Sequence, residues 1–224
     1  MPLFNLLRTV PEVRRDVSAR LQNKERNRAA ASKFGEAYFD GTREQGYGGY
    51  RYDGRWVDVA RTAIERYGLE PGHKVLDVGC AKGFFVHDLI RTLPGLEAWG
   101  LDVSAYALSK APREVAGNLV LGDARDLPFP DDSFDAVFSI NTIHNLDEAG
   151  CRQALREMNR VCRDPHRTFV QVDAYRTPAE RDLFEAWMLT ARTYCMPAQW
   201  EALFEAAGYR GDYFWTILQP ELSE

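Results

Sequence analysis

Apolar residues in the middle of the chain come in short continuous runs, separated by stretches with helical spacing. The runs predict five strands, at residues 73–79, 96–101, 118–121, 134–140 and 168–172. Helical spacing between them predicts helices over residues 83–92, 104–110 and 148–161. Strands that alternate with helices in this way predict an α/β fold, in which helices cover both faces of a parallel sheet. A ligand crevice is then expected outside the carboxyl ends of the strands.

The segments that flank this alternation extend the same domain. Residues 56–67 have helical periodicity, and Gly68 follows where a helix would end. Pro178 and Pro197 each begin a predicted helix, to about residues 193 and 207, and residues 212–218 read as a last strand. We therefore expect a mostly parallel sheet of six strands, or of seven if the chain closes with an antiparallel hairpin.

The first 55 residues lack this alternation. Residues 11–31 are rich in arginine and alanine and contain no glycine, which predicts an exposed helix that either packs lightly on the body or covers a substrate pocket or a dimer partner. Residues 46–56 combine four glycines with three tyrosines and a tryptophan. They predict a loop that either packs irregularly on the core or closes over a ligand as a lid. We interpret residues 1–55 as an N-terminal extension with a lid loop, and residues 56–224 as the main domain.

Composition places the chain among ordinary globular proteins. Its 224 residues fit one domain with modest extensions, and no apolar stretch approaches the roughly 20 residues of a membrane span. The four cysteines lack metal-ligand spacing, so we expect reduced thiols, a cytoplasmic protein and no metal site. The net charge is −5, but residues 1–30 hold seven Lys or Arg against three Asp or Glu, a net of +4 there and −9 elsewhere. The acidic body disfavours a nucleic-acid partner, which the basic N-terminus alone keeps open.

The stretch from Lys74 to Phe85 carries the clearest chemistry. An apolar run ends at Asp77, a glycine turn follows, and helical spacing begins, which predicts a strand that leads into a helix N-terminus with outward-pointing N–H groups. Gly79 allows a ligand to approach the backbone, and Gly83 allows the helix to pack closely on the strand. A carboxylate at Asp77 would repel a pyrophosphate but would accept hydrogen bonds from an ammonium group. The site therefore suits a cationic nucleoside better than a dinucleotide.

A second acidic residue ends the next predicted strand. Asp102 lies 25 residues after Asp77, close to the interval of about 20 residues at which an acid reaches ribose hydroxyls in nucleotide-binding sheets. The alternative interpretation is an acid that caps the following helix. Because the two motifs occur together, we favour ribose binding.

Four motifs in order resemble those of the class I S-adenosylmethionine (SAM)-dependent methyltransferases, and in particular their type 11 subgroup. They are Val75–Gly83, Gly100–Ser104, Gly122–Ala124 and Leu127–Asp135, and the resemblance covers roughly residues 56–173. One position departs from the pattern, because Ala81 stands where the family usually has glycine. The resemblance implies a Rossmann-like methyltransferase fold and SAM as cofactor, with S-adenosylhomocysteine as its product.

The resemblance also implies which residues hold the cofactor. In the family, an acid after the third strand accepts from the adenine amino group, the residue after the fourth strand contacts the methionine part, and a tyrosine just before the core touches the methionine end. Carried over to this sequence, the cofactor-binding candidates are Tyr50, Asp77, Gly79, Cys80, Gly83, Asp102, Val103, Asp123, Ala124 and Asn141. Lys82, on the first helical turn, is expected to face solvent.

Three residues on the rim beyond the strands are the catalytic candidates. His144 has a near-neutral reference pKa and could take a proton from an acceptor, or it could simply pack in its loop. Asp173 and Tyr175 could hold a polar substrate, with Asp173 as a base, or belong to a salt-bridged loop. Asn145 or Asp147 is expected to cap the next helix.

These features together predict a SAM-dependent methyltransferase of small polar molecules, with O-methylation of a sugar or of a phosphorylated metabolite as the narrower expectation. N-methylation, RNA methylation and a non-catalytic SAM-binding partner subunit stay open as alternatives. A nicotinamide dehydrogenase is disfavoured, because it would need glycine at Ala81 and no acid at Asp77. A homodimer through the N-terminal helix is the expected assembly.

Overall fold

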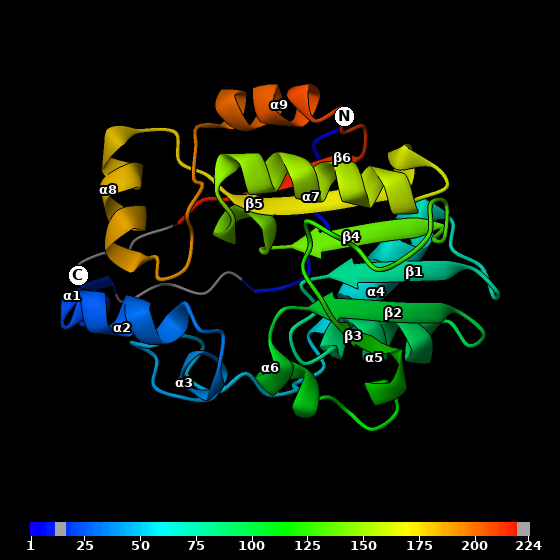
Figure 1. Ribbon diagram of the computed structural model, residues 1–224, viewed down its shortest axis with the longest axis horizontal. Coiled ribbons are helices and arrows are strands. Elements are labelled where there is room, and N and C mark those ends of the chain that lie inside the picture. The colour runs from blue at the N-terminus through cyan, green and yellow to red at the C-terminus, as the bar shows by residue number, and fades with distance from the viewer. Residues whose placement is uncertain (12–16, 219–224) are drawn as a thin grey trace.

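The computed structural model describes residues 1–11 and 17–218 (Figure 1). The strands are β1 (Lys74–Val78), β2 (Glu97–Asp102), β3 (Leu119–Leu121), β4 (Ala136–Ile140), β5 (Thr168–Asp173) and β6 (Asp212–Thr216). The α-helices are α1 (Val17–Leu21), α2 (Lys24–Ala31), α3 (Glu36–Phe39), α4 (Trp56–Tyr67), α5 (Phe84–Thr92), α6 (Ala105–Ser109), α7 (Glu148–Val161), α8 (Pro178–Trp187) and α9 (Pro197–Ala206). Short 3₁₀ turns are η1 (Ala116–Asn118), η2 (Ile143–Asn145) and η3 (Pro165–Arg167).

The strands form one six-stranded sheet in the order β3-β2-β1-β4-β5-β6, and each neighbouring pair is parallel. The predicted parallel α/β sheet is therefore confirmed, and of the two strand counts the structure has six. In place of a closing antiparallel hairpin, β6 pairs in parallel with β5. The strand order reverses direction between β1 and β4, which is where α/β sheets bind ligands.

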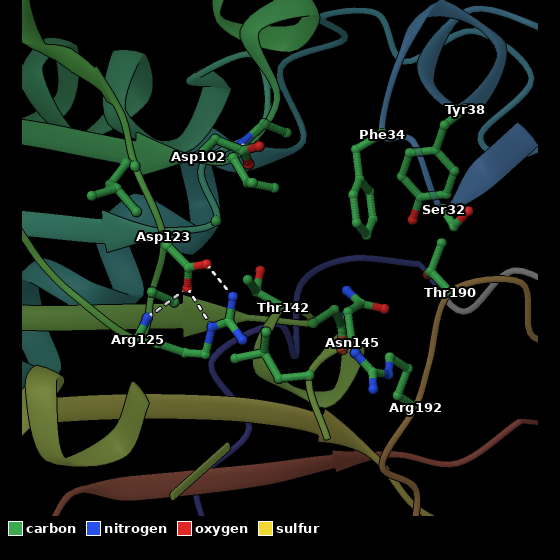
Figure 2. Close-up of a pocket in the computed structure, with 18 of the residues that line it drawn as sticks. Ser32, Phe34, Tyr38, Asp102, Asp123, Arg125, Thr142, Asn145, Thr190 and Arg192 are labelled. Carbon is green, nitrogen blue, oxygen red and sulfur yellow. Dashed lines mark hydrogen bonds and ion pairs between the residues drawn. The ribbon is translucent and has the colours of Figure 1, made fainter. Parts of the chain in front are cut away.

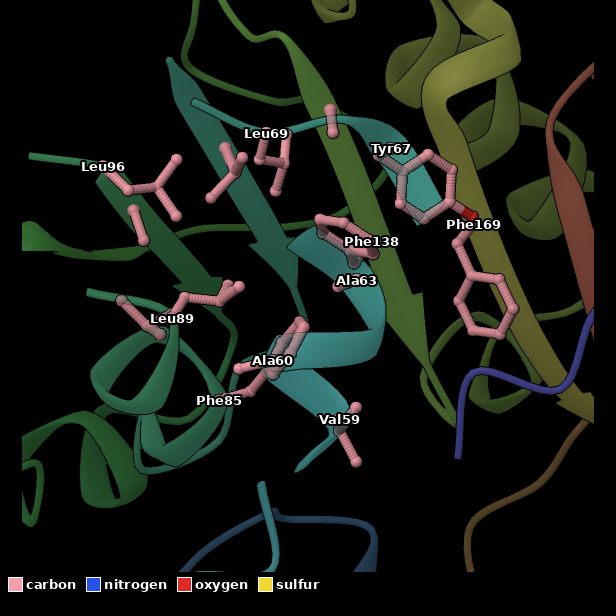
Figure 3. Packing of buried hydrophobic residues seen from close by; sticks show 14 of the residues in the cluster. Val59, Ala60, Ala63, Tyr67, Leu69, Phe85, Leu89, Leu96, Phe138 and Phe169 are labelled. Atoms are coloured by element: carbon pink, nitrogen blue, oxygen red, sulfur yellow. The ribbon is translucent and has the colours of Figure 1, made fainter. Parts of the chain in front are cut away.

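Helices cover both faces of the sheet because the inward-facing strand residues are apolar on each side. One face packs against α4 and α5 around Phe85, Phe138 and Phe169 (Figure 3). The other face packs against α7 and α9, with Leu155 and Trp200 fully buried. The sheet is thus held rigidly between two apolar layers, and the loops at its carboxyl edge have a fixed base.

Predicted helices α4 and α7 have the expected bounds, whereas α8 is shorter than predicted. It ends at Trp187, six residues before the expected end, and the chain continues as a loop that leads to α9. The helix ends early because the backbone forms tertiary hydrogen bonds instead of helical ones. The N–H groups of Arg192 and Thr193 donate to the carbonyl of His144 at 2.9 and 3.0 Å. This loop, residues 188–196, becomes part of the site described below.

Helices α1, α2 and α3 of the N-terminal extension lie beyond the carboxyl ends of the strands, where α1 packs against α8 (Figure 1). The single helix predicted over residues 11–31 is wrong in part, because α1 and α2 are separated at Asn23, whose φ of 55° is left-handed. Residues 12–16 of that prediction lie outside the described residues. The packing is not light: the Arg20 guanidinium lies 3.5 Å from the centroid of the Trp187 ring and donates to the Gly46 carbonyl at 2.5 Å.

Candidate active site

A cavity of about 360 Å³ opens at the carboxyl edge of the sheet, between the strand ends and the N-terminal extension (Figure 2). Its first wall follows β1 to β4 and consists of Gly79, Ala81, Leu101, Asp102, Val103, Gly122, Asp123, Ala124, Arg125, Asn141 and Thr142. Its second wall consists of Ser32, Phe34, Tyr38, Phe39, Tyr47, Asn145, Leu146, Thr190 and Arg192. Residues from nearly the whole length of the chain therefore meet around one space.

The turn after β1 has the backbone that a close ligand approach requires. Gly79 has a φ of 87°, and a Cβ built on it would lie 2.1 Å from the Thr142 hydroxyl oxygen, so only glycine fits there. Ala81 also has a left-handed φ, of 51°. Because a left-handed conformation costs a non-glycine residue roughly 1–2 kcal/mol, the departure from the glycine pattern is tolerated at a cost.

The Asp102 carboxylate is held at the end of β2 by two backbone donors. Its Oδ2 accepts from the Ala81 N–H at 2.7 Å and its Oδ1 from the Ser104 N–H at 2.8 Å. Each oxygen keeps acceptor capacity, since a carboxylate oxygen has two lone pairs. The cap of α6 is Ser104, whose hydroxyl accepts from the Ala107 N–H at 3.0 Å, so Asp102 is not the helix cap. Burial raises the pKa of Asp102.

Asp77 is a buried carboxyl group for which the described residues supply no hydrogen-bond or ion-pair partner; its exposed fraction is 5%. Burial, with the nearby Asp102 charge as a second cause, raises its pKa from 3.8 to about 8. An uncompensated carboxyl group of this kind would be stabilised by a cation. The residues present therefore fit a ligand that brings an ammonium group and a ribose.

Comparisons with known proteins agree with this geometry. Residues 75–165 match the family model described as a methyltransferase domain. Residues 75–165 therefore form a methyltransferase domain. Its cofactor is S-adenosyl-L-methionine. The matched model is a general one, so the type 11 subgroup stays a prediction.

Several individual proteins resemble this methyltransferase domain. Cycloartenol-C-24-methyltransferase of Arabidopsis thaliana is 31% identical over 160 residues, 62% of this chain and 46% of that protein. A fatty-acid O-methyltransferase of Mycolicibacterium smegmatis is 38% identical over 106 residues, 46% of this chain and 38% of that protein. A methyltransferase solved with the Trm112 activator of Haloferax volcanii superposes with a TM-score of 0.54 and 28% identity, over 66% of each chain. The chain thus spans less than half the length of these two curated relatives.

We call the first wall the cofactor wall. On it, Asp123, the acid predicted to accept from the adenine amino group, is already paired with an arginine. Asp123 accepts from Arg125 Nη2 at 2.6 Å and from Nε at 2.9 Å, and this hydrogen bonding lowers its pKa. Its Oδ2 keeps a free lone pair for an amino group. Asn141 has a left-handed φ of 53°, and its Oδ1 accepts from the Thr216 hydroxyl at 2.9 Å. Val103 and Ala124 line the cavity as well.

The other predicted cofactor residues, Tyr50, Asp77, Cys80 and Gly83, are not among the residues that line the cavity. Tyr50 stacks on the Phe84 ring at 5.0 Å between centroids and contacts Tyr47 at 4.7 Å, so the glycine- and tyrosine-rich loop is packed in the structure. Their roles toward the cofactor stay predictions.

The three catalytic candidates also lie outside the cavity lining. The structure does bring two of them together: His144 Nδ1 accepts from the Asp173 N–H at 3.1 Å, and His144 Nε2 lies 3.3 Å from Asp173 Oδ2. Tyr175 instead contacts the Tyr194 ring, with 6.5 Å between centroids, and the Arg181 guanidinium on α8. Both ring nitrogens of His144 are therefore engaged within the protein, and a catalytic role for the three residues stays a prediction.

The expectation for Lys82 is wrong. Its side chain is buried, with an exposed fraction of 5% for the residue, and its ammonium group contacts both oxygens of Asp40 at 2.7 Å and the Tyr50 carbonyl at 2.8 Å. The Tyr106 hydroxyl donates to Asp40 at 2.8 Å. Lys82 is buried because Asp40 and Tyr50 of the N-terminal extension cover it.

Sequence reasoning missed most of the second wall. Phe34 and Tyr38 come from the N-terminal extension, and Thr190 and Arg192 from the loop after α8 (Figure 2). Of the two predicted helix caps, Asn145 and Asp147, the cap of α7 is Asp147, whose Oδ1 accepts from the Gly150 N–H at 2.9 Å. The Asn145 Oδ1 atom is buried and has no partner among the described residues, which marks this wall as one that a polar ligand would complete.

Within the described ranges, no helix is both long and apolar enough to span a membrane. The same ranges contain no group of three or more His, Cys, Asp or Glu residues arranged to hold a metal ion. The four cysteines are free.

Proposed function

We propose that this protein transfers a methyl group from SAM to an oxygen atom of a small polar molecule. One observation carries the proposal: a single cavity joins the strand ends, where Asp102 is positioned, to a second wall of aromatic and polar side chains. A cofactor held on the first wall would face an acceptor held on the second.

The protein would then contribute by aligning the acceptor with the methyl group and by excluding water from the site. Bound SAM supplies a methyl group on a positively charged sulfur atom, a reactivity that belongs to the cofactor. Asp102 would accept from the ribose hydroxyls, and Asp77 from the ammonium group. Phe34, Tyr38 and Tyr47 would exclude water from the acceptor side and orient the acceptor for in-line displacement.

The second wall favours an acceptor that is polar and carries a negative charge. Arg192 offers a guanidinium group, Thr190 and Tyr38 offer hydroxyls, and the tyrosine rings offer flat surfaces. These groups suit a sugar derivative or a phosphorylated metabolite, the narrower expectation from the sequence. The relative named as a fatty-acid O-methyltransferase supports oxygen as the accepting atom, whereas the relative named for cycloartenol C-24 shows that related chains also methylate carbon.

The expected homodimer through the N-terminal helices stays a separate proposal, because part of the surface of these helices is used within the chain. The Lys24 ammonium group donates to the Glu185 carbonyl at 2.6 Å, and Arg20 stacks on Trp187, so this side of α1 and α2 is used within the chain. A dimer through the helices would have to use their remaining surface.

The first experiment is a calorimetric titration of the full chain with SAM, S-adenosylhomocysteine and NAD. We expect micromolar binding of the two sulfur nucleosides and none of NAD. Asp102→Ala should lose the binding, while Asp58→Ala should keep it, because Asp58 lies on the surface of α4 in an exposed pair with Arg61. A melting curve for each variant establishes that it is folded. Binding of NAD, or no binding of either sulfur nucleoside, would overturn the proposed function.

A further inference from the structure

The second wall contains no side chain that could act as a general base. Among the described residues that form it, the polar groups are hydroxyls of Ser32, Tyr38, Tyr47 and Thr190, the amide of Asn145 and the guanidinium of Arg192. The two carboxylates of the cavity, Asp102 and Asp123, belong to the cofactor wall. An acceptor that must lose a proton before it reacts would therefore find no group there to take it.

The tyrosines of this wall do not fill that role. Burial raises the pKa of Tyr38, and proximity to Tyr38 together with burial raises the pKa of Tyr47 well above its ordinary value. Both phenols therefore stay protonated at neutral pH and act as hydrogen-bond donors. His144 is likewise occupied, since its two ring nitrogens face the backbone and the carboxylate of Asp173.

Arg192 is placed to bind an anion instead. It follows Thr190 by two residues in the loop after α8, and both side chains line the cavity (Figure 2). Its contact with Asp147 is long, at 3.4 Å, and the two side chains are 61% and 56% exposed. A solvent-exposed pair of this kind contributes little, and a ligand carboxylate could replace it with bidentate hydrogen bonds.

We propose that the methyl acceptor is a carboxylate group, bound by Arg192 and Thr190, and that the product is a methyl ester. The proposal rests on the proposed function and names its substrate class. A carboxylate is already ionised at neutral pH, so it needs no base. One of its oxygens forms the new O–CH₃ bond while the S–CH₃ bond breaks, the bonding pair stays on sulfur, and no proton moves.

The first test measures binding rather than turnover. The protein saturated with S-adenosylhomocysteine is titrated with acid and alcohol pairs of one skeleton: decanoate with 1-decanol, 4-hydroxycinnamate with 4-hydroxycinnamyl alcohol, and glucuronate with glucose. We expect at least one acid to bind at least tenfold more tightly than its alcohol. Arg192→Met should weaken that acid by about 10- to 100-fold, the range for a hydrogen bond to a charged group, and leave the alcohol unchanged. Arg192→Lys should fall between the two.

Arg210→Met is the matched control for this series. Arg210 is exposed and immediately precedes the Gly211 that leads into β6, at the opposite edge of the sheet from the cavity. Its removal should leave binding of the acid unchanged. An equal loss in both variants would show a general effect of charge and would overturn the role of Arg192.

The second test identifies the product. The same pairs are incubated with methyl-labelled SAM, and the products are treated with mild alkali, which releases a methyl ester as volatile labelled methanol but leaves a methyl ether or a methylamine intact. Alkali-labile label from an acid supports the proposal. Alkali-stable label would overturn it while leaving the proposed function in place. Acids that bind no better than their alcohols, with no alkali-labile label, would also overturn it. If SAM itself fails to bind, the proposed function falls first.

Discussion

The buried carboxyl group of Asp77 makes a prediction about proton release. With its pKa raised to about 8, Asp77 is about 90% protonated at pH 7 in the cofactor-free protein. An ammonium group bound beside it would favour the ionised form. Binding of S-adenosylhomocysteine, which carries the same ammonium group as SAM, should therefore release about 0.9 proton at pH 7. Affinity should rise by about tenfold for each pH unit up to 8 and level off above it.

The same group should make the cofactor-free protein progressively less stable as the pH rises from about 4 to about 8. The pKa of Asp77 lies about four units higher in the folded state than its ordinary value of 3.8. Its contribution to stability is then fully present below about pH 4 and is lost as the pH rises through 8. Since each unit corresponds to about 1.4 kcal/mol, the loss is on the order of 5 kcal/mol. Asp77→Asn removes the titrating group and should flatten this part of the pH profile.

Proton release is measured by titrating S-adenosylhomocysteine into the protein in buffers that differ in their enthalpy of ionisation. The slope of observed enthalpy against buffer enthalpy gives the protons released. Wild type and Asp58→Asn should give the same slope, and Asp77→Asn should give a slope near zero with weaker binding. The reasoning is refuted if wild type releases no proton, or if Asp77→Asn releases as many as wild type.

Three further changes test the structure around the cavity. Ala81→Gly should raise stability by about 1 kcal/mol, because it relieves the left-handed φ of 51°; calorimetric melting checks this, and an unchanged or lower melting temperature counts against it. Lys82→Met should cost about 1–2 kcal/mol and speed amide exchange around residue 40, since it leaves the Asp40 carboxylate without its cationic partner; unchanged denaturation and exchange would show that the pair is not needed. Arg20→Met should speed exchange around Gly46 and Trp187 together, and a change at only one of them would mean that Arg20 does not join the two segments.

The cofactor wall could be predicted from sequence because its signals are local. A strand that ends at Asp77, a turn at Gly79 and a helix start are neighbours in the chain, and their local geometry does not depend on distant residues. Asp102 follows the same logic one strand later. The parallel order of the strands then places both acids at one edge without further information.

The second wall could not be predicted because it is assembled by tertiary contacts. Tyr38 and Thr190 are more than 150 residues apart, and neither belongs to a motif. The loop that carries Thr190 and Arg192 forms because two N–H groups donate to the His144 carbonyl instead of continuing α8. Helical periodicity cannot reveal such tertiary hydrogen bonds, which explains why the predicted helix extends beyond the observed end of α8.

Residues 1–55, which we interpret as an extension with a lid, are tied to the main domain by direct contacts beside the cavity. The Ser104 hydroxyl, which caps α6 beside Asp102, donates to the Phe34 carbonyl at 2.5 Å, and Lys82 in the turn after β1 holds Asp40. The same residues that shape the cofactor wall therefore also fix the segment that carries Phe34 and Tyr38. Because these links are short and mostly buried, movement of the N-terminal segment would change both walls at once. Substrate selectivity in this protein should accordingly depend on the extension as much as on the sheet.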